Sequence, residues 1–389
     1  MQIDLIKSWI DSKLFKEIKD LLHSNSANNI NQIQKIKTCY PQAPVNELFT
    51  FASLQIKHLD KLKITENWLL TDKNAQQASS YTIAKYNGSI MQKYQTCADL
   101  CCGIGMDLWS ISQNKTVCYA VDLSKNILSY AKYNMGLYSD RNIIFQNIKA
   151  EEFNETVEAI FIDPDRRLDD KRSNNPFNMS PDLFAIEELE KRYPQIAVKL
   201  SPMIDYDRYN FFKKGQLHFV QENNELKEIL YCSPDLAETN TKRCVILPEN
   251  IYFDEIEETN SELDKIGQHI YEPSPAIIKA HLIENLAALL NINKIDPLLA
   301  LLSSDKQIDS PFVKRYEVVE IMPFSIKKLN SYIAAQQIAM LDIKTRGFSE
   351  TVESFRRKLK LQKGSHKAVL FIVKIGKTHS FIICDYQLI

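Results

Sequence analysis

Two of the nine glycines in this 389-residue chain stand one residue apart, in the segment Asp99-Leu-Cys-Cys-Gly-Ile-Gly105. An apolar run ending at Cys101 precedes them, and a helix-like stretch begins at Met106. The sequence therefore predicts a strand, a tight turn and a helix. Because the chain is so poor in glycine, two glycines at such a turn indicate that the backbone itself approaches a ligand.

Predicted strands and helices alternate along the chain after residue 95. The strands are expected at 96–101, 117–122, 143–146, 159–163 and 196–201, with helices at 124–135 and 181–193. This alternation predicts an α/β fold with a Rossmann-like, mostly parallel and doubly wound sheet. Segments 216–220, 226–232 and 244–248 have no helices between them, so we expect antiparallel strands at the edge of that sheet.

Four domains are expected from the pattern. Residues 1–75 form a helical region, because apolar residues recur there at helical spacing, and 76–250 form the α/β domain. Residues 251–312 form a linker and helical connector, with a break at Glu272-Pro-Ser-Pro275. Residues 313–389 show a compact βαβαββ pattern that resembles a ferredoxin-like α+β module, and Gly376-Lys377-Thr378 joins its last two strands.

Composition is that of a soluble protein, with 44% apolar and 25% charged residues. No run approaches the roughly 20 apolar residues that span a bilayer, and no secretory signal is apparent, so we expect a cytoplasmic protein without a membrane partner. The eight cysteines show no paired spacing, which favours reduced thiols. Neither they nor the histidines have the spacing of metal ligands, so no metal is expected.

Charge is unevenly distributed along the chain. Residues 314–389 contain 14 basic and 6 acidic residues, a net charge of +8, whereas the rest of the chain carries −9. A basic C-terminal domain is where a polyanion such as RNA would bind. A solvated basic surface with no partner is the alternative.

Asp122 indicates which kind of ligand the glycine turn holds. It ends the second predicted strand, nineteen residues after Gly103, the arrangement that grips a ribose. Dinucleotide sites prefer a third glycine, but the chain has Leu108 there. No Gly-Lys-Ser/Thr follows, which excludes a P-loop. Asp99 before the turn suits S-adenosylmethionine, whose aminoacyl part is cationic.

The segment Ile160-Phe-Ile-Asp163-Pro164-Asp165-Arg166-Arg167 adds a second motif at the same sheet edge. Together with the glycine turn and Asp122, it resembles class I S-adenosylmethionine-dependent methyltransferases over residues 76–250. The Asp-Leu-x-Cys-Gly-x-Gly form is similar to that of RNA methyltransferases. With Gln77-Ala78-Ser79 and Glu272-Pro-Ser-Pro275, the chain resembles a bacterial family that has a C-terminal THUMP-like, ferredoxin-like module. The core of that family is similar to trimethylguanosine synthase, and THUMP-type modules are associated with RNA binding.

The resemblance implies a set of cofactor-binding positions in this sequence: Gln77, Asp99, Cys101, Gly103, Gly105, Asp107, Asp122, Leu123, Ala150 and Asp163. The chain departs from the usual pattern at two places. Cys101 replaces the first glycine of the turn, and Lys149 stands near the position of the acid that contacts adenine. Adenine recognition is therefore expected to use backbone groups and apolar side chains.

The expected catalytic segment is Asp163, Pro164, Asp165, Arg166 and Arg167. Asp163 would orient the acceptor or accept its proton, and the arginines would hold a phosphate or base. The aromatic residue that often stacks on the acceptor base in amino methyltransferases is missing here, although arginine planes also stack. Alternatively, Arg166 and Arg167 pair with Asp165, Asp169 or Asp170 and only order the loop.

Other residues near the sheet edge bear on which acceptor the chain methylates and how. No cysteine follows the strand 196–201, which disfavours a covalent attack on a pyrimidine ring. Lys199 could face the acceptor, but a solvated or salt-bridged lysine is the simpler interpretation. The aromatic run 206–212 could line the acceptor pocket or pack in the core.

Three functions remain open from the sequence. The first is an RNA base N-methyltransferase, with tRNA or rRNA as the acceptor. The second is a methyltransferase acting on a protein or small molecule. The third is a catalytically silent protein that binds the cofactor.

Overall fold

The computed structural model describes residues 6–24, 30–63, 67–168, 171–237, 239–256, 263 and 265–385, and of residues 30, 31, 167, 168, 171 and 172 only the backbone. The chain divides into two compact units. The first unit is Met1–His218 with Glu228–Asn240, and the second is Phe219–Lys227 with Thr241–Ile389.

A parallel sheet forms the centre of the first unit. Its strands are β1 (Thr96–Leu100), β2 (Val117–Val121), β3 (Ile143–Gln146), β4 (Ala159–Ile162) and β7 (Ile196–Leu200). The full order of the nine-stranded sheet is β11-β10-β8-β9-β7-β4-β1-β2-β3, with β8 (Gln216–Glu222), β9 (Glu225–Cys232), β10 (Lys242–Leu247) and β11 (Ile251–Asp254); β10 and β11 fall within the residues of the second unit. β9 is antiparallel to β7, and β10 is antiparallel to β11. The predicted α/β class and the five parallel strands are confirmed.

The register of the central strands brings their carboxyl ends together. Asp99 of β1 pairs with Ala120 of β2 and with Phe161 of β4. β4 and β7 are buried along their whole length, as expected for strands covered on both faces. Asp122 and Asp163, which the sequence placed at strand ends, lie one residue beyond β2 and β4. Their side chains are therefore at the same edge of the sheet as the glycine turn.

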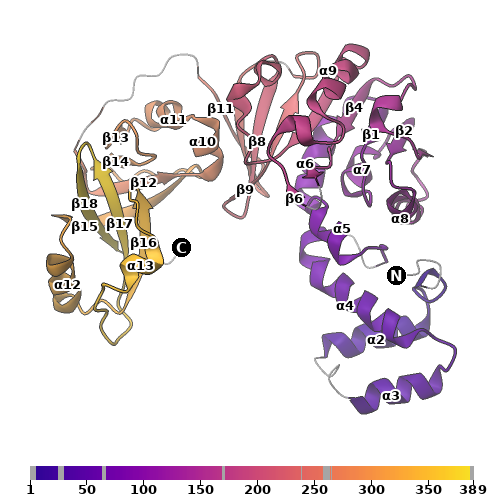
Figure 1. Ribbon diagram of the computed structural model, residues 1–389, viewed down its shortest axis with the longest axis horizontal. Helices are drawn as coiled ribbons and strands as arrows, with labels where there is room; N and C mark the ends of the chain where they lie inside the picture. Colours follow the sequence, from indigo (N-terminus) through magenta and orange to yellow (C-terminus); the bar gives the residue numbers. More distant parts are fainter. Residues whose placement is uncertain are drawn as a thin grey trace. The chain divides into compact units, whose positions relative to one another are not determined.

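The helices of the first unit that follow its N-terminal region accompany this sheet. They are α5 (Asp72–Gln77), α6 (Tyr81–Ile90), α7 (Met106–Ile111), α8 (Lys125–Met135) and α9 (Leu183–Arg192). Ser80, Ser124 and Asp182 accept backbone N–H groups in the first turns of α6, α8 and α9. Gly105 is the N-cap of α7, with φ of 94°. Figure 1 shows the strands β1, β2 and β4 with these helices around them.

The predicted helical N-terminal region is helical in its described part. It contains α2 (Lys13–His23), α3 (Ile30–Cys39) and α4 (Val45–Leu62). Phe15 of α2 and Phe51 of α4 stack with their ring centroids 5.7 Å apart. Short elements complete the unit: β5 (Arg167–Leu168), β6 (Lys171–Arg172), and 3₁₀ turns η2 (Ala150–Glu152), η3 (Pro176–Asn178), η4 (Tyr206–Arg208) and η5 (Asn210–Lys213).

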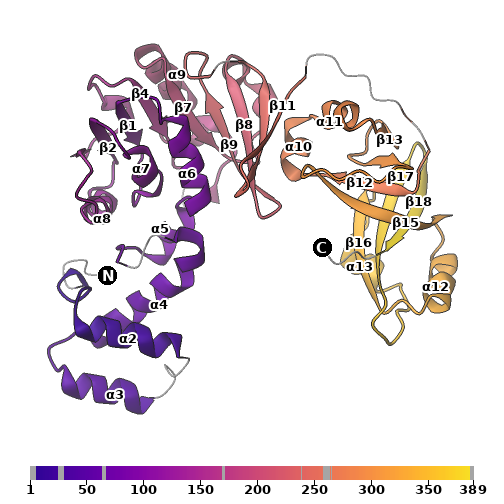
Figure 2. The same ribbon diagram turned by 180° about the vertical axis from the view of Figure 1, so that it is seen from behind.

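A seven-stranded sheet organises the second unit (Figure 2). Its order is β13-β14-β12-β15-β18-β17-β16, with β12 (His269–Pro273), β13 (Asn293–Lys294), β14 (Leu302–Ser304), β15 (Val313–Pro323), β16 (Met340–Arg346), β17 (Lys367–Ile375) and β18 (Thr378–Asp385). The helices are α10 (Pro275–Ala280), α11 (Ile283–Leu290), α12 (Ile326–Ala335) and α13 (Val352–Arg356). β16 and β17 are parallel, whereas β15 and β17 are both antiparallel to β18.

The segment expected to be a helical connector contributes strands to this sheet. Its helices end at Leu290, because Asn291 adopts a left-handed conformation with φ of 52°. β13 and β14 follow, and β12 pairs with β15 over Pro273↔Val313 to His269↔Glu317. Helical stretches were expected from Ala276 to Leu302, but the part after Leu290 forms loop and strand.

Alternate residues of β17 and β18 face two separate apolar cores, as the period of a strand requires. On one face, Leu370, Ile372, Phe381 and Ile383 pack with Leu329 and Ile333 of α12 and Phe355 of α13. On the other, Val369, Phe371, Val373, Ile382 and Cys384 pack with Ile270, Ile295, Leu299 and Leu301. The C-terminal βαβαββ pattern is therefore covered on its second face by residues 266–301.

Among the described residues, no helix has both the length and the apolar character needed to cross a membrane.

Candidate functional site

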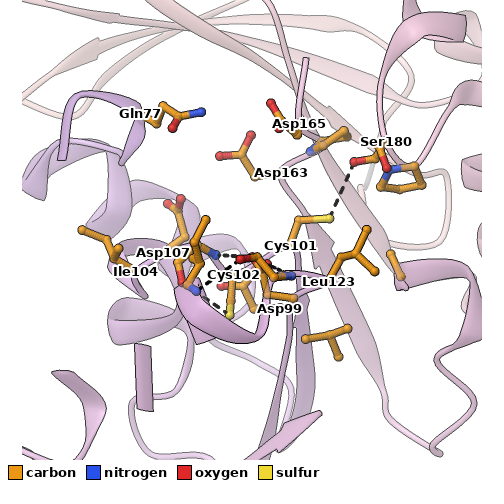
Figure 3. A pocket seen from close by; sticks show the side chains of 18 of the residues that line it. Gln77, Asp99, Cys101, Cys102, Ile104, Asp107, Leu123, Asp163, Asp165 and Ser180 are labelled. Carbon is orange, nitrogen blue, oxygen red and sulfur yellow. Dashed lines mark hydrogen bonds between the residues drawn. The ribbon is translucent and has the colours of Figure 1, made fainter. Parts of the chain in front are cut away.

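A cavity of about 470 Å³ opens at the carboxyl edge of β1, β2 and β4. We call it the central cavity. Most of the expected site residues line it: Gln77, Asp99, Cys101, Gly103, Asp107, Asp122, Leu123, Ala150, Asp163, Pro164, Asp165 and Arg166. Figure 3 shows Gln77, Asp163 and Asp165 around this space, with the glycine turn below them. Gly105 is not among the lining residues, and the side chain of Arg167 lies outside the described part of the chain.

The glycine turn is formed by residues with positive φ. Cys101, Gly103 and Gly105 have φ of 75°, 55° and 94°. Cys101 thus occupies the left-handed region that favours glycine, which explains why the usual turn has a glycine there. A Cβ built on Gly103 would meet no atom within 4 Å, whereas one on Gly105 would lie 3.4 Å from Met135 Cε. Gly103 therefore exposes its backbone to open space in the cavity.

Asp122 is fixed by two backbone groups. Its Oδ2 accepts the Gly103 N–H at 3.1 Å, and its Oδ1 accepts the Ser124 N–H at 2.8 Å. Burial raises the pKa of Asp122, while these two hydrogen bonds act in the opposite direction. The expected ribose-binding acid is thus held in one orientation beside the glycine turn, with further lone pairs on both oxygens.

Asp99 is a buried carboxylate with unmet hydrogen-bonding capacity. It is 1% exposed, and neither oxygen has a hydrogen-bond partner among the described residues. Burial, and then the negative charges of Asp107 and Asp163, raise its pKa well above the usual range. An unpartnered carboxylate is costly unless a ligand supplies a donor or a positive charge. Its surroundings therefore fit a cationic group.

Asp163 is paired with Lys199 at one end of the cavity. Its Oδ2 lies 2.8 Å from Lys199 Nζ, and its side chain is 26% exposed. Lys199 is therefore salt-bridged and buried, which agrees with the simpler of the two sequence interpretations. Asp165 pairs through its backbone with Ser180, at 3.0 and 2.9 Å, and this brings Ser180 and Pro181 to the cavity. Arg166 is partly buried.

Several residues at or next to this site were not predicted from the sequence. Ser180 and Pro181 reach the cavity only through that long-range pairing, and Glu228 approaches Lys199 from β9, so neighbouring sequence gave no signal for them. Lys149 lines the cavity at the position where an acid was expected. Cys101 Sγ points to Ser180 O at 3.8 Å, as Figure 3 shows.

The aromatic run 206–212 packs mainly in the core, since Tyr206, Phe211 and Phe212 are all buried. Phe211 and Phe212 both contact Tyr231 of β9, with ring centroids 4.7 and 5.8 Å apart. The packing interpretation of this run is the one the structure supports. The eight cysteines are free thiols, as expected.

Comparison with known proteins agrees with this architecture. The family described as THUMP domain-like matches residues 313–386. Two curated relatives from strains of Mycobacterium tuberculosis are named uncharacterized S-adenosylmethionine-dependent methyltransferases. Each is 24% identical over 314 residues, which cover 79% of this chain and 85% of the relative. A crystal structure of a methyltransferase candidate from Porphyromonas gingivalis W83 has a TM-score of 0.74 at 20% identity, covering 97% of this chain and 99% of that one.

The resemblance inferred from the motifs is confirmed at this level. The chain has the fold of the Porphyromonas gingivalis structure, its residues 313–386 match the THUMP domain-like family, and its curated relatives are named as S-adenosylmethionine-dependent methyltransferases. The predicted enzyme class and cofactor agree with those names. Similarity to trimethylguanosine synthase remains a prediction.

Proposed function

We propose that this chain transfers the methyl group of S-adenosylmethionine to a base nitrogen of RNA, with tRNA or rRNA as the acceptor. The observation that carries the proposal is the central cavity, where the glycine turn, Asp122, the unpartnered Asp99 and Asp163 lie together. The cavity has the size of a site for one cofactor-sized molecule.

The residues of the cavity fit S-adenosylmethionine. Asp99 would receive the cationic aminoacyl group, because both of its oxygens lack partners. The open space over Gly103 would admit the ligand against the backbone. Asp122 would accept hydrogen bonds from the ribose hydroxyls. When bound, the cofactor supplies a methyl group on a sulfonium centre, open to in-line attack.

The chain's own contribution is to place the acceptor. Positioning the attacking nitrogen accounts for much of the acceleration in such a displacement. Asp163 has one oxygen held by Lys199 and a second with which to accept the N–H of the acceptor. Arg166 at the cavity would hold a phosphate or stack on a base.

RNA as the acceptor is supported by the C-terminal unit. The THUMP-like match covers residues 313–386 and so overlaps the segment 314–389 of net charge +8. Arg356, Arg357, Lys360 and Lys363 are all exposed on α13 and the segment that follows it. Exposed cations gathered in this way attract a polyanion.

Methyl transfer from labelled S-adenosylmethionine tests the proposal. RNA from a strain that lacks this protein is fractionated, incubated with the full chain, and digested for nucleoside mass spectrometry. We expect a methylated base in one RNA fraction, with transfer reduced about 100-fold or more by Asp163→Ala, because this change removes the oxygen that orients the acceptor nitrogen. Labelling of protein instead, or cofactor binding without any transfer, would establish one of the other two functions.

The RNA part is tested separately by salt dependence. Replacing Arg356, Arg357, Lys360 and Lys363 by Gln should weaken RNA binding and flatten its dependence on salt, because fewer counterions are released. Replacing the exposed Lys35 and Lys37 of α3 by Gln is the matched control. RNA binding that is insensitive to salt in the unmodified chain would contradict the proposal.

A further inference from the structure

A buried lysine, Lys199, lies next to the central cavity without lining it, and its charged contacts are not explained by cofactor binding alone. Lys199 is only 6% exposed. Its Nζ lies 2.8 Å from Asp163 Oδ2, 3.7 Å from Asp107 Oδ2 and 3.6 Å from Glu228 Oε2. Asp163 and Asp107 line the cavity, whereas Lys199 and Glu228 are not among its lining residues. One ammonium group therefore faces three carboxylates from behind the cavity wall.

Hydrogen bonds connect this ammonium to both sides of the site. Lys199 donates to Ser79 Oγ at 2.7 Å, and the Ser79 hydroxyl donates to Asp107 Oδ2 at 2.6 Å. Asn87 donates to Asp107 Oδ1 at 2.9 Å. Ser79 follows α5, Asp107 lies in α7, and Asp163 follows β4. Three segments that are distant in sequence thus converge on a single charged group.

The charges around Lys199 do not balance. Burial alone would lower the pKa of Lys199, but its carboxylate neighbours outweigh burial and raise it, so the ammonium is charged. Burial raises the pKa of Glu228 to about 7, against the attraction of Lys199. Glu228 Oε1 has no hydrogen-bond partner among the described residues. Above this pKa Glu228 is ionised, so the cluster of Lys199, Asp163, Asp107 and Glu228 carries more negative than positive charge.

We propose that Lys199 is a positioning residue whose ammonium holds Asp163 for the acceptor and whose charge sets how strongly the cavity prefers a cationic ligand over an uncharged one. This inference rests on the proposed function, because the sulfonium of S-adenosylmethionine is positive and the thioether of S-adenosylhomocysteine is neutral. Removing the ammonium leaves the carboxylates unopposed and increases the preference for the sulfonium. Removing one carboxylate decreases it.

Calorimetric titration of the full chain with the two ligands, near pH 8.5, tests the charge effect. The measured quantity is the dissociation constant of S-adenosylhomocysteine divided by that of S-adenosylmethionine. We expect this ratio to rise about fivefold in Lys199→Met and to fall about fivefold in Glu228→Gln. In the double variant it should return to the wild-type ratio, because one charge of each sign has been removed.

Lys294→Met is the matched control. Lys294 is also 6% exposed and pairs with Glu284 at 2.5 Å, but it belongs to the second unit and does not line the cavity. Its replacement should cost stability and leave the ratio unchanged. If Lys199 has a purely structural role, Lys199→Met should likewise lose stability and leave the ratio of the two dissociation constants unchanged. If Lys199→Met alone fails to fold, the double variant is compared with Glu228→Gln, and its ratio should be about fivefold higher.

Methyl transfer tests the positioning effect. The double variant restores the charge balance but not the hydrogen bond to Asp163. We expect kcat at least about tenfold below wild type, with KM for S-adenosylmethionine within about threefold. A wild-type kcat in the double variant would overturn the positioning role, and an unchanged ratio in Lys199→Met would overturn the charge role. A wild-type chain that binds neither ligand would instead defeat the proposed function, and this inference with it.

Discussion

At the scale of single residues, the site depends on groups whose bonding is incomplete in the protein alone. Asp99 has no partner for either carboxylate oxygen although it is buried. Such an arrangement costs stability, and it persists where a ligand completes it. The two unpartnered oxygens of Asp99 therefore favour a role in ligand binding.

We expect Asp99→Asn to weaken S-adenosylmethionine binding about tenfold or more, because a carboxylate attracts the cationic ligand and an amide does not. The raised pKa of Asp99 adds a pH effect. Binding of a cation requires the ionised carboxylate, so affinity in the unmodified chain should rise with pH through a range above the usual one for aspartate. Asp99→Asn should remove that rise. Calorimetry across pH measures both effects, and the exposed Asp20→Asn is the control; a wild-type affinity in Asp99→Asn would contradict the assignment.

The two glycines of the turn offer a matched pair. Gly103 faces open space in the cavity, whereas a Cβ at Gly105 would approach Met135. Both have positive φ, so Ala should cost about 1 kcal/mol or more of unfolding free energy at either. We expect Gly103→Ala to weaken cofactor binding strongly, because its methyl group occupies the space of the ligand. Gly105→Ala should lose more stability than affinity. Denaturant unfolding and calorimetry on both variants separate the two, and equal loss of affinity would refute the distinction.

At the scale of elements, Glu272 links strands on either side of the second sheet. It begins the Glu272-Pro-Ser-Pro275 motif and lies on β12. Its carboxylate accepts hydrogen bonds from Lys344 Nζ at 2.7 Å, from Arg346 at 2.6 Å and from the Tyr316 hydroxyl at 2.9 Å. The motif thus has a structural role, since it connects the segment before the THUMP-like domain to β15 and β16.

Glu272→Gln should lower the unfolding free energy of this unit by about 2 kcal/mol at pH 7, because it leaves two cations without their partner. Burial raises the pKa of Glu272, but the bonds from Lys344, Tyr316 and Arg346 outweigh burial and lower it below its ordinary 4.5. A lowered folded pKa stabilises above the ordinary value, and this is lost as the pH falls through the folded pKa. The difference between variant and wild type should therefore shrink as the pH falls through the folded pKa of Glu272, which lies below the ordinary value for glutamate. Unfolding curves at several pH values measure it, with the exposed Glu353→Gln as control; a difference that persists undiminished at low pH would rule out the ionic origin.

Elements with regular periodicity could be predicted from the sequence, and long-range pairings could not. The strands β1 to β4 and β7 lie within one residue of their expected bounds, because buried apolar runs bounded by turns are distinctive. The sequence indicated that Lys199 lies at the sheet edge. Its partners Ser79 and Glu228 could not be predicted, because they come from segments that only the folded sheet brings together. The strands β13 and β14 were missed because they are two and three residues long, too short to show an alternating pattern.

At the scale of the whole molecule, the packing on one face of β17 and β18 determines where the chain can be cut to give a C-terminal fragment that folds. Val369, Phe371 and Val373 on that face are covered by residues 266–301, which lie outside the THUMP-like match. A domain cut at residue 313 would expose these side chains. Each buried side chain of this size contributes about 1.5–3 kcal/mol.

We therefore expect a fragment of residues 265–389 to fold and unfold cooperatively, and a fragment of 313–389 to aggregate or bind a hydrophobic dye. Circular dichroism, thermal unfolding and dye fluorescence on the two fragments decide between these outcomes. Cooperative unfolding of the shorter fragment without dye binding would show that its second face needs no cover.

The backbone hydrogen bonds that hold Asp122 have a consequence for the thermodynamics of recognition. The Gly103 and Ser124 amides fix this carboxylate in its orientation before any ligand arrives. A side chain that is already ordered loses little rotational freedom when a hydroxyl binds to it. The entropic cost of association should then fall on the ligand more than on the protein, and flexible analogues of the nucleoside should bind less well than rigid ones of equal polarity.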